Sequence, residues 1–211
     1  MHRASKHRKP AKDWVHMPEA RKEIRELRKT VLGWDRNMTW GKTRFHQAQI
    51  CFFMSYMLCG SGPCRRDLCN VTYGQGPQRV DSQSHEIVFE SMNKDRKDKP
   101  REPLRVKLCR ETWALFSRLR KQHRLRGLSG QRLLYNKHFQ PLKSSSLNAY
   151  LAKTCSESLA SFEGKHCTCT LLRRMFVTWK RRGDLSKVEK EDLASNMSHT
   201  TQMQEGYRQP E

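Results

Sequence analysis

Two helical patterns of different kinds follow one another near the start of the chain. One face of the first segment carries apolar side chains at helical spacing: Ala20, Ile24, Leu27 and Val31. Glutamate, lysine and arginine fill its other face, so the pattern predicts an amphipathic helix from Pro18 to Gly33. From about Lys42 to Cys59, apolar residues occur all round the helix, which predicts a second helix at the centre of the core.

The apolar period changes in the middle of the chain. Residues 87–89 are Ile-Val-Phe, and in 104–108 leucine and valine alternate with arginine and lysine, as in a half-exposed strand. A charged turn over 93–100 separates the two segments. Together they predict a β-hairpin with a basic tip.

Helical spacing returns after the hairpin. It predicts helices over 113–126, 144–159 and 170–182, the last one ended by Gly183. The sequence Ser186-Lys-Val-Glu189 is a capping box, which predicts a further helix that runs toward Asn196. The sum is an α+β domain that is mostly helical and has one small antiparallel sheet.

Charge narrows the classes of partner. The chain has 211 residues, with 42 Lys and Arg against 21 Asp and Glu, and a formal net charge of +21. A field this positive attracts polyanions, of which nucleic acid is the commonest. The segment 1–17 is a basic arm with too few apolar residues to fold alone, either a disordered tail or an arm that contacts DNA or directs nuclear import.

Three other classes of protein are disfavoured. No apolar run approaches the ~20 residues needed to span a bilayer, and no secretory signal is visible, so we expect no membrane partner. The eight cysteines do not have the paired spacing of a structural zinc site, so we expect reduced, buried thiols and no metal. No glycine-rich phosphate loop or dinucleotide fingerprint is present, and we expect no cofactor.

The last forty residues carry candidate chemistry in the order Arg173, His199, Tyr207. An arginine can hold a phosphate with two hydrogen bonds, a histidine can donate a proton to it, and a tyrosine hydroxyl can attack it and become covalently linked. On the helix over 170–182, Leu172, Phe176 and Trp179 share one face. Arg173 lies at the edge of that face, with Arg174 as a solvent-facing alternative.

This order resembles the catalytic domain of the tyrosine recombinase, or phage integrase, family. The family's His-x-x-Arg box is similar to Thr170-Leu-Leu-Arg173, which Phe176-Val-Thr178 follows. The family's third box is similar to Leu193-Ala194-Ser-Asn-Met-Ser-His199, with Tyr207 after it. The closing Tyr-Arg-Gln-Pro-Glu resembles integrase-like open reading frames from mobile elements of fish and invertebrate genomes.

The resemblance extends upstream. The predicted hairpin is similar to the family hairpin whose tip carries a lysine acid. Lys94 matches that position best, with Lys97 and Lys99 as rivals that would contact DNA. The segment 134–148 resembles the stretch that leads into the second box.

Two positions depart from the family pattern. The first box has Gly-x-Arg before an acid and Leu, whereas this chain reads Gly62-Pro-Cys64-Arg65-Arg66-Asp-Leu. An ungapped alignment puts Cys64 at the arginine position, and Arg65 serves there only if the turn shifts by one residue. Thr170 stands where the family has histidine, which removes one hydrogen-bond partner of the phosphate.

The resemblance implies a mechanism without metal or cofactor. Tyr207 would attack a phosphodiester of double-stranded DNA and form a 3′-phosphotyrosine. Arg173, with Arg65 or Arg66, would balance the developing charge. Lys94 would protonate the leaving 5′ oxygen, and His199 would assist at the phosphate. Further DNA contacts are expected from five residues: Arg66, Thr170, Arg174, Lys97 and Lys99.

The resemblance also implies a domain division. Residues 42–211 would form the integrase-like catalytic domain, and residues 1–41 a basic arm plus one helix in place of a full core-binding domain. Assembly into a homo-oligomer on DNA is a further implication. Localisation would be nuclear, or cytosolic for a chain of prokaryotic or viral origin.

Three functions stay open at the level of sequence. The first is an active DNA strand transferase. The second is a catalytically decayed, non-enzymatic DNA-binding relic of a mobile-element recombinase, which the degenerate first box around Cys64 would explain. The third is an unrelated basic RNA-binding protein.

Overall fold

The computed structural model describes residues 14–59, 66–74, 76–90, 103–128, 132–183 and 185–196. Its α-helices are α1 (Met17–Gly33), α2 (Lys42–Met54), α3 (Arg110–Leu125), α4 (Leu147–Ser158), α5 (Cys169–Lys180) and α6 (Lys187–Asn196). The strands are β1 (Gln78–Asp81), β2 (Glu86–Phe89) and β3 (Leu104–Lys107). Short helical segments are η1 (Ser55–Cys59), η2 (Arg66–Asn70), η3 (Ser144–Ser146) and η4 (Ala160–Phe162).

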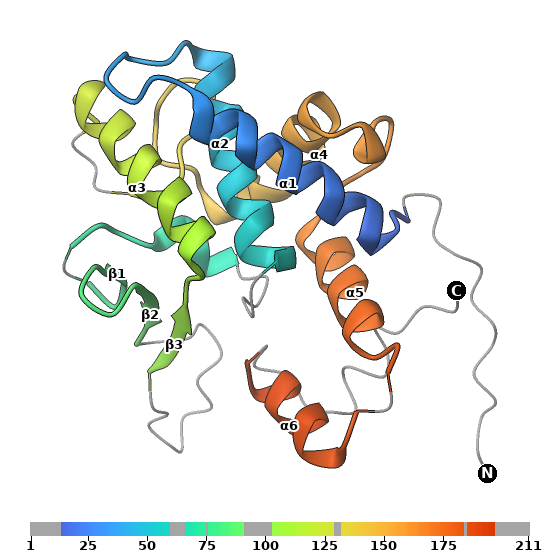
Figure 1. The fold of residues 1–211 in the computed structure, drawn as a ribbon. Coiled ribbons are helices and arrows are strands. Elements are labelled where there is room, and N and C mark those ends of the chain that lie inside the picture. Colours follow the sequence, from blue (N-terminus) through green and yellow to red (C-terminus); the bar gives the residue numbers. More distant parts are fainter. Residues whose placement is uncertain are drawn as a thin grey trace.

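Helix α2 is the centre of the helical core, as the apolar residues all round it predict. Every side chain from Ala48 to Leu58 is buried. Helices α1, α3 and α4 pack against α2, and α5 packs against η1, which continues α2 (Figure 1). A helix with neighbours on several sides buries side chains all round its axis, which explains why apolar residues in this segment are not confined to one face.

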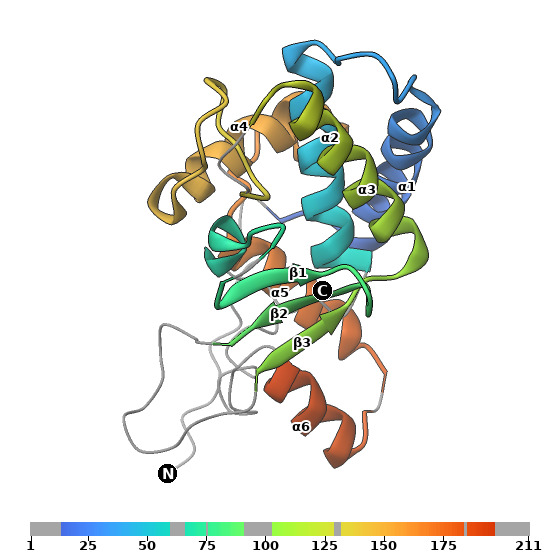
Figure 2. The same cartoon turned by 90° about the vertical axis from the view of Figure 1, so that its left-hand side faces the viewer.

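The small sheet has the strand order β1-β2-β3, with both pairs antiparallel (Figure 2). Ile87 pairs with Val106, and Phe89 pairs with Leu104, so the predicted hairpin is confirmed. Strand β1 was not predicted, because Val80 is its one apolar residue and its only buried one. The α+β, mostly helical fold class is therefore confirmed, with one more strand than the pattern predicted.

Helix α1 has nearly the predicted bounds and belongs to the same hydrophobic core as the rest. Met17, Ala20, Ile24 and Val31 are buried in one cluster with residues from the other helices. The Glu23 carboxylate also accepts hydrogen bonds from the backbone N–H of Ser161 at 2.9 Å and from its hydroxyl at 2.8 Å. These bonds join α1 to η4, although the domain boundary near residue 41 stays a prediction.

A buried polar cluster links α2 to the segment before α4. Gln49 is fully buried, and its side-chain amide pairs with the backbone of Tyr135 in both directions, at 2.8 and 2.9 Å. Nearby His46 contacts Gln49 at 3.1 Å, and burial, with Lys42 and Arg126 close by, lowers the pKa of His46 to about 4. Sequence patterns gave no sign of this cluster, because single polar residues within apolar runs do not show their partners.

A second buried histidine lies close to the first. His123 is 3% exposed, and the hydroxyl of Tyr73 is hydrogen-bonded to its Nδ1 atom. Burial, with Arg126 nearby, lowers the pKa of His123 to about 3. Both rings are therefore neutral in the folded protein at pH 7.

The structure also bears on three other features: membrane spans, cysteine thiols and metal-binding groups. Within the described ranges, no helix is long and apolar enough to cross a membrane. Six described cysteines carry free thiols, and five of them are buried: Cys51, Cys69, Cys155, Cys167 and Cys169. No group of metal-binding side chains is found among the described residues.

Candidate active site

The start of α5 is fixed by two side-chain caps. The Thr168 hydroxyl accepts a hydrogen bond from the backbone N–H of Leu171 at 3.1 Å. The Asn148 side-chain oxygen, from α4, accepts from the backbone N–H of Cys169 at 3.1 Å. Free N–H groups at a helix start need such acceptors, so the two caps set where α5 begins and bind it to α4. Arg173 follows one turn later.

Arg173 lies at the edge of the buried face of α5. Leu172 is fully buried and Phe176 is 3% exposed, as their spacing predicts. Arg173 is half-buried, and Thr170, three residues earlier, is exposed on the first turn. Residues three apart on a helix are neighbours, so Thr170 and Arg173 present a hydroxyl and a guanidinium from one side of α5.

Arg174 lies deeper than expected. Its side chain is half-buried, whereas the sequence pattern placed it toward solvent. Its Nε atom is enclosed, and no hydrogen-bond partner for it occurs within the described ranges. Helical periodicity predicts on which side of the helix a residue lies, but not which neighbouring segment covers that side.

Helix α6 begins with the predicted capping box. The Ser186 hydroxyl accepts from the backbone N–H of Glu189 at 3.3 Å, and the Glu189 carboxylate accepts from the backbone N–H of Ser186 at 2.9 Å. Ala194 is buried, and Leu193 packs against the core. The first half of the third box is thus an ordered, core-packed helix end. His199 and Tyr207 lie outside the described residues.

Helix α6 lies below α5 in Figure 1, and strands β2 and β3 lie in the same lower half of that view. Strand β2 ends at Phe89 and β3 begins at Leu104, so the connection carries Lys94, Lys97 and Lys99. These lysines and Arg65 lie outside the described residues. The backbone of Arg66 opens η2, but its side chain also lies outside them.

The arrangement defines a tyrosine-recombinase-like fold: a helical core, a three-stranded antiparallel sheet, and a final helix pair. A solved structure described as the crystal structure of XerA recombinase matches it with a TM-score of 0.63 at 14% sequence identity. The match covers 97% of this chain and 62% of that chain, so this chain spans less than two thirds of the recombinase's length.

Sequence comparison gives no further match. No protein-family model matches the chain, and no curated protein does. The likeness to XerA recombinase therefore establishes the fold, and the roles of individual residues stay predictions.

Proposed function

We propose that this chain is a DNA-binding protein of the tyrosine recombinase type that cuts and rejoins DNA through a 3′-phosphotyrosine intermediate. The observation that carries the proposal is the position of Arg173. It lies at the edge of the buried face of a doubly capped helix, in a fold that resembles that of XerA recombinase. A net charge of +21 supplies the attraction to DNA.

The proposed reaction begins with attack by Tyr207 on a phosphodiester of DNA. The Tyr207 hydroxyl gives its proton to solvent water and its oxygen attacks the phosphorus, the bond from phosphorus to the 5′ oxygen breaks, and a 3′-phosphotyrosine forms. Lys94 gives its proton to the leaving 5′ oxygen. Arg173 and Arg65 stabilise the charge on the phosphate oxygens, and His199 donates a hydrogen bond to them. Attack of the 5′ hydroxyl on the phosphotyrosine then rejoins the strand.

Other parts of the proposal concern the whole chain. Residues 42–211 form the catalytic domain, and residues 1–41 supply a basic arm and α1. The protein acts on double-stranded DNA in the nucleus and assembles on it as a homo-oligomer. Its source is a mobile element of the integrase-like type.

A second candidate function is favoured by one feature of the sequence. Cys64 stands at the first arginine position in the ungapped alignment, and Thr170 replaces the histidine of the second box. Losing one charge-stabilising donor from a transition state typically costs ~10²–10³-fold in rate. A chain without that arginine is a DNA-binding relic of a recombinase.

A nicked suicide duplex separates the two candidates. The wild-type protein is incubated with duplexes nicked just beyond the cleavage site, so that the short fragment with the freed 5′ hydroxyl is lost and a phosphotyrosyl adduct accumulates. We expect a covalent adduct that is absent from Tyr207→Phe, although both proteins bind the duplex. Arg65→Ala should also abolish the adduct while binding persists.

The opposite pattern supports the relic. In that case wild type forms no adduct, and Cys64→Arg restores one that still depends on Tyr207. If neither protein forms an adduct but both bind DNA, the strand-transfer proposal fails. Failure to bind duplex DNA at all would remove both candidates and leave the RNA-binding alternative.

A further inference from the structure

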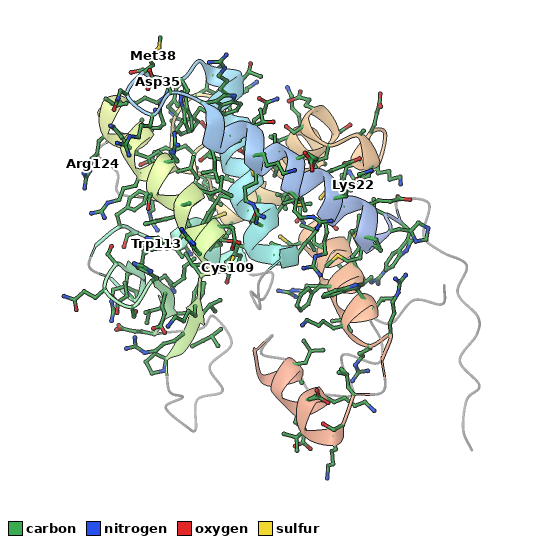
Figure 3. All side chains as sticks on the ribbon, viewed as in Figure 1. Lys22, Asp35, Met38, Cys109, Trp113 and Arg124 are labelled. Atoms are coloured by element: carbon green, nitrogen blue, oxygen red, sulfur yellow. The ribbon has the colours of Figure 1, made fainter. Side chains whose placement is uncertain are left out.

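The outer face of α3 has a hollow of about 610 Å³ that the proposed recombinase chemistry does not use. Its lining includes the aromatic side chains Trp113 and Phe116 and three cations, Arg120, Lys121 and Arg124. Helix α3 packs against α2 from the side opposite to α5, and it faces the viewer in Figure 2. Arg124 projects from α3 into solvent in Figure 3, whereas Trp113 is half-buried and packs against the hydrophobic core.

The three cations have no carboxylate partner within the described ranges. The Lys121 ammonium donates to the Asn37 side-chain oxygen at 2.6 Å, and an Arg120 nitrogen donates to the Ser82 hydroxyl at 3.5 Å. Both acceptors are neutral, so they hold the cations in place without cancelling their charge. Helix α3 carries a single acid, Glu111, in its first turn, far along the helix from Arg124.

Part of this charge has a local explanation. Arg124 lies in the last turn of α3, where the partial negative charge of the helix end favours a cation. That effect reaches only the last turn, so it leaves Arg120 unexplained. Three cations that share one hollow and lack acidic partners are typical of a surface for polyanions.

The aromatic wall shows which part of a polyanion the hollow fits. The Trp113 ring is stacked against His85 at 4.1 Å and against Phe116 at 4.7 Å, so its two faces are covered. A nucleic-acid base therefore finds no open ring face there, whereas single-strand binding relies on such faces. The hollow suits the charged backbone of a duplex.

Spacing along the helix agrees with this assignment. Arg120 and Arg124 are one turn apart, which is about 6 Å along the helix axis. A duplex carries one phosphate per ~3.4 Å of its axis on each strand, so two neighbouring cations on this face can meet phosphates of one strand.

We propose that the outer face of α3 is a second binding surface for the backbone of duplex DNA. With the Arg173 side of the molecule on the first duplex, this face contacts a second segment of DNA. The inference rests on the proposed DNA partner, but not on catalysis.

The experiment measures whether one protein brings two duplexes together. Donor-labelled and acceptor-labelled duplexes of random sequence are mixed with full-length protein, and energy transfer reports pairing while anisotropy reports binding to a single duplex. The test variant is Arg120→Gln, Lys121→Gln, Arg124→Gln. The control variant, Lys22→Gln, Arg25→Gln, Lys29→Gln, removes the same charge from α1, and Lys22 lies on another face of the molecule (Figure 3).

We expect wild type and the α1 variant to pair the duplexes and the α3 variant to lose pairing while still binding one duplex. If the three cations of α3 neutralise three phosphates, the slope of log K for pairing against log salt concentration should differ by ~2.7 between the α3 variant and the α1 variant. The exchange Arg120→Lys, Arg124→Lys keeps the charge and should keep pairing. Lys121 should also react less with an amine-modifying reagent when DNA is present.

Equal pairing by the two triple variants, or equal reaction of Lys121 with and without DNA, would overturn the inference. If the α3 triple variant does not fold, Arg124→Gln replaces it as the test variant, because an exposed side chain can be changed without disturbing the core. A wild-type protein that binds no duplex at all would instead contradict the proposed function, so the two failures are distinguishable.

Discussion

At the residue scale, Arg173 is the one proposed catalytic residue that lies within the described ranges. Its half-buried stem follows Leu172 and precedes Phe176, so the apolar side of α5 limits the directions that the side chain can take. A guanidinium restricted in this way loses less conformational freedom when it binds a phosphate than a fully exposed one does.

Arg173→Ala should therefore reduce covalent adduct formation by ~10²–10³-fold, the usual effect of losing one charge-stabilising donor. The rate is measured on the suicide duplex. Arg173→Ala is introduced into the wild-type sequence, or into the Cys64→Arg variant if wild type is inactive. Lys180→Ala is the matched control, because it removes an exposed cation from the last turn of the same helix. An unchanged rate in Arg173→Ala would remove this arginine from the site.

The buried histidines predict how folding stability depends on pH. The pKa of His123 falls from 6.5 to about 3 on folding, so below pH 6.5 the unfolded chain binds a proton that the folded protein excludes. The contribution of neutral His123 to the free energy of unfolding is thus fully present above pH 6.5. It falls as the pH drops toward 3, by up to ~1.4 kcal/mol per pH unit. His46 adds a smaller loss between pH 6.5 and about 4, because its ring is only half-buried and solvent screens part of the effect.

Urea unfolding at pH 7 and pH 5 measures this effect. His123→Phe should be less stable at pH 7, because the Tyr73 hydroxyl loses its partner, but should lose less stability than wild type on going to pH 5. The exposed His138 provides the control, and His138→Phe should keep the wild-type slope. A slope in His123→Phe equal to that of wild type would show that this ring does not exclude the proton.

At the element scale, sequence patterns identify helices and strands well where one side of an element is apolar or where the residues of a capping box are present. The periodicity of α1, the burial of the second half of α2, the hairpin and the Ser186–Glu189 box were all predictable from the sequence. Strand β1 was not, because its place depends on backbone pairing with β2 and only one of its residues is buried. For the site, the edge position of Arg173 was predictable, but the cover over Arg174 comes from other segments.

The contact between α1 and η4 allows a test of the domain division. Glu23→Ala should cost ~1.5–3 kcal/mol, the usual range for hydrogen bonds to a charged group, because its carboxylate accepts from both the backbone N–H and the hydroxyl of Ser161. Glu26→Ala is the control. Its carboxylate pairs with the exposed Lys29, so the cost should stay below ~1 kcal/mol.

Calorimetry measures both variants and the number of transitions. One cooperative transition that moves as a whole in Glu23→Ala is expected, because α1 lies in the common core. Two separate transitions, with only the first affected, would instead show that the segment up to residue 41 folds by itself.

At the scale of the whole molecule, net charge acts on folding and on binding in opposite directions. A charge of +21 repels itself, and compaction on folding increases that repulsion. The ion pairs of the described residues lie between side chains that are at least partly exposed, so they offset little of it. Salt screens both the self-repulsion and the attraction to DNA.

One salt titration should therefore raise Tm and weaken DNA binding. Between 50 and 200 mM salt, a protein that contacts 6–10 phosphates loses ~10³–10⁵-fold in affinity, with log K falling by ~0.9 per neutralised phosphate. Over the same range Tm of the free protein should rise, because the folded state gains more from screening than the unfolded chain does. Tyr207→Phe should follow both curves, since charge and not the nucleophile supplies the affinity.

Sucrose at the same osmolarity is the control for the salt titration. It stabilises the folded protein without screening charges, and it should leave DNA binding nearly unchanged. A flat binding curve would argue against a nucleic-acid partner. A Tm that falls with salt would show that favourable ion pairs, and not self-repulsion, dominate the charge of this fold.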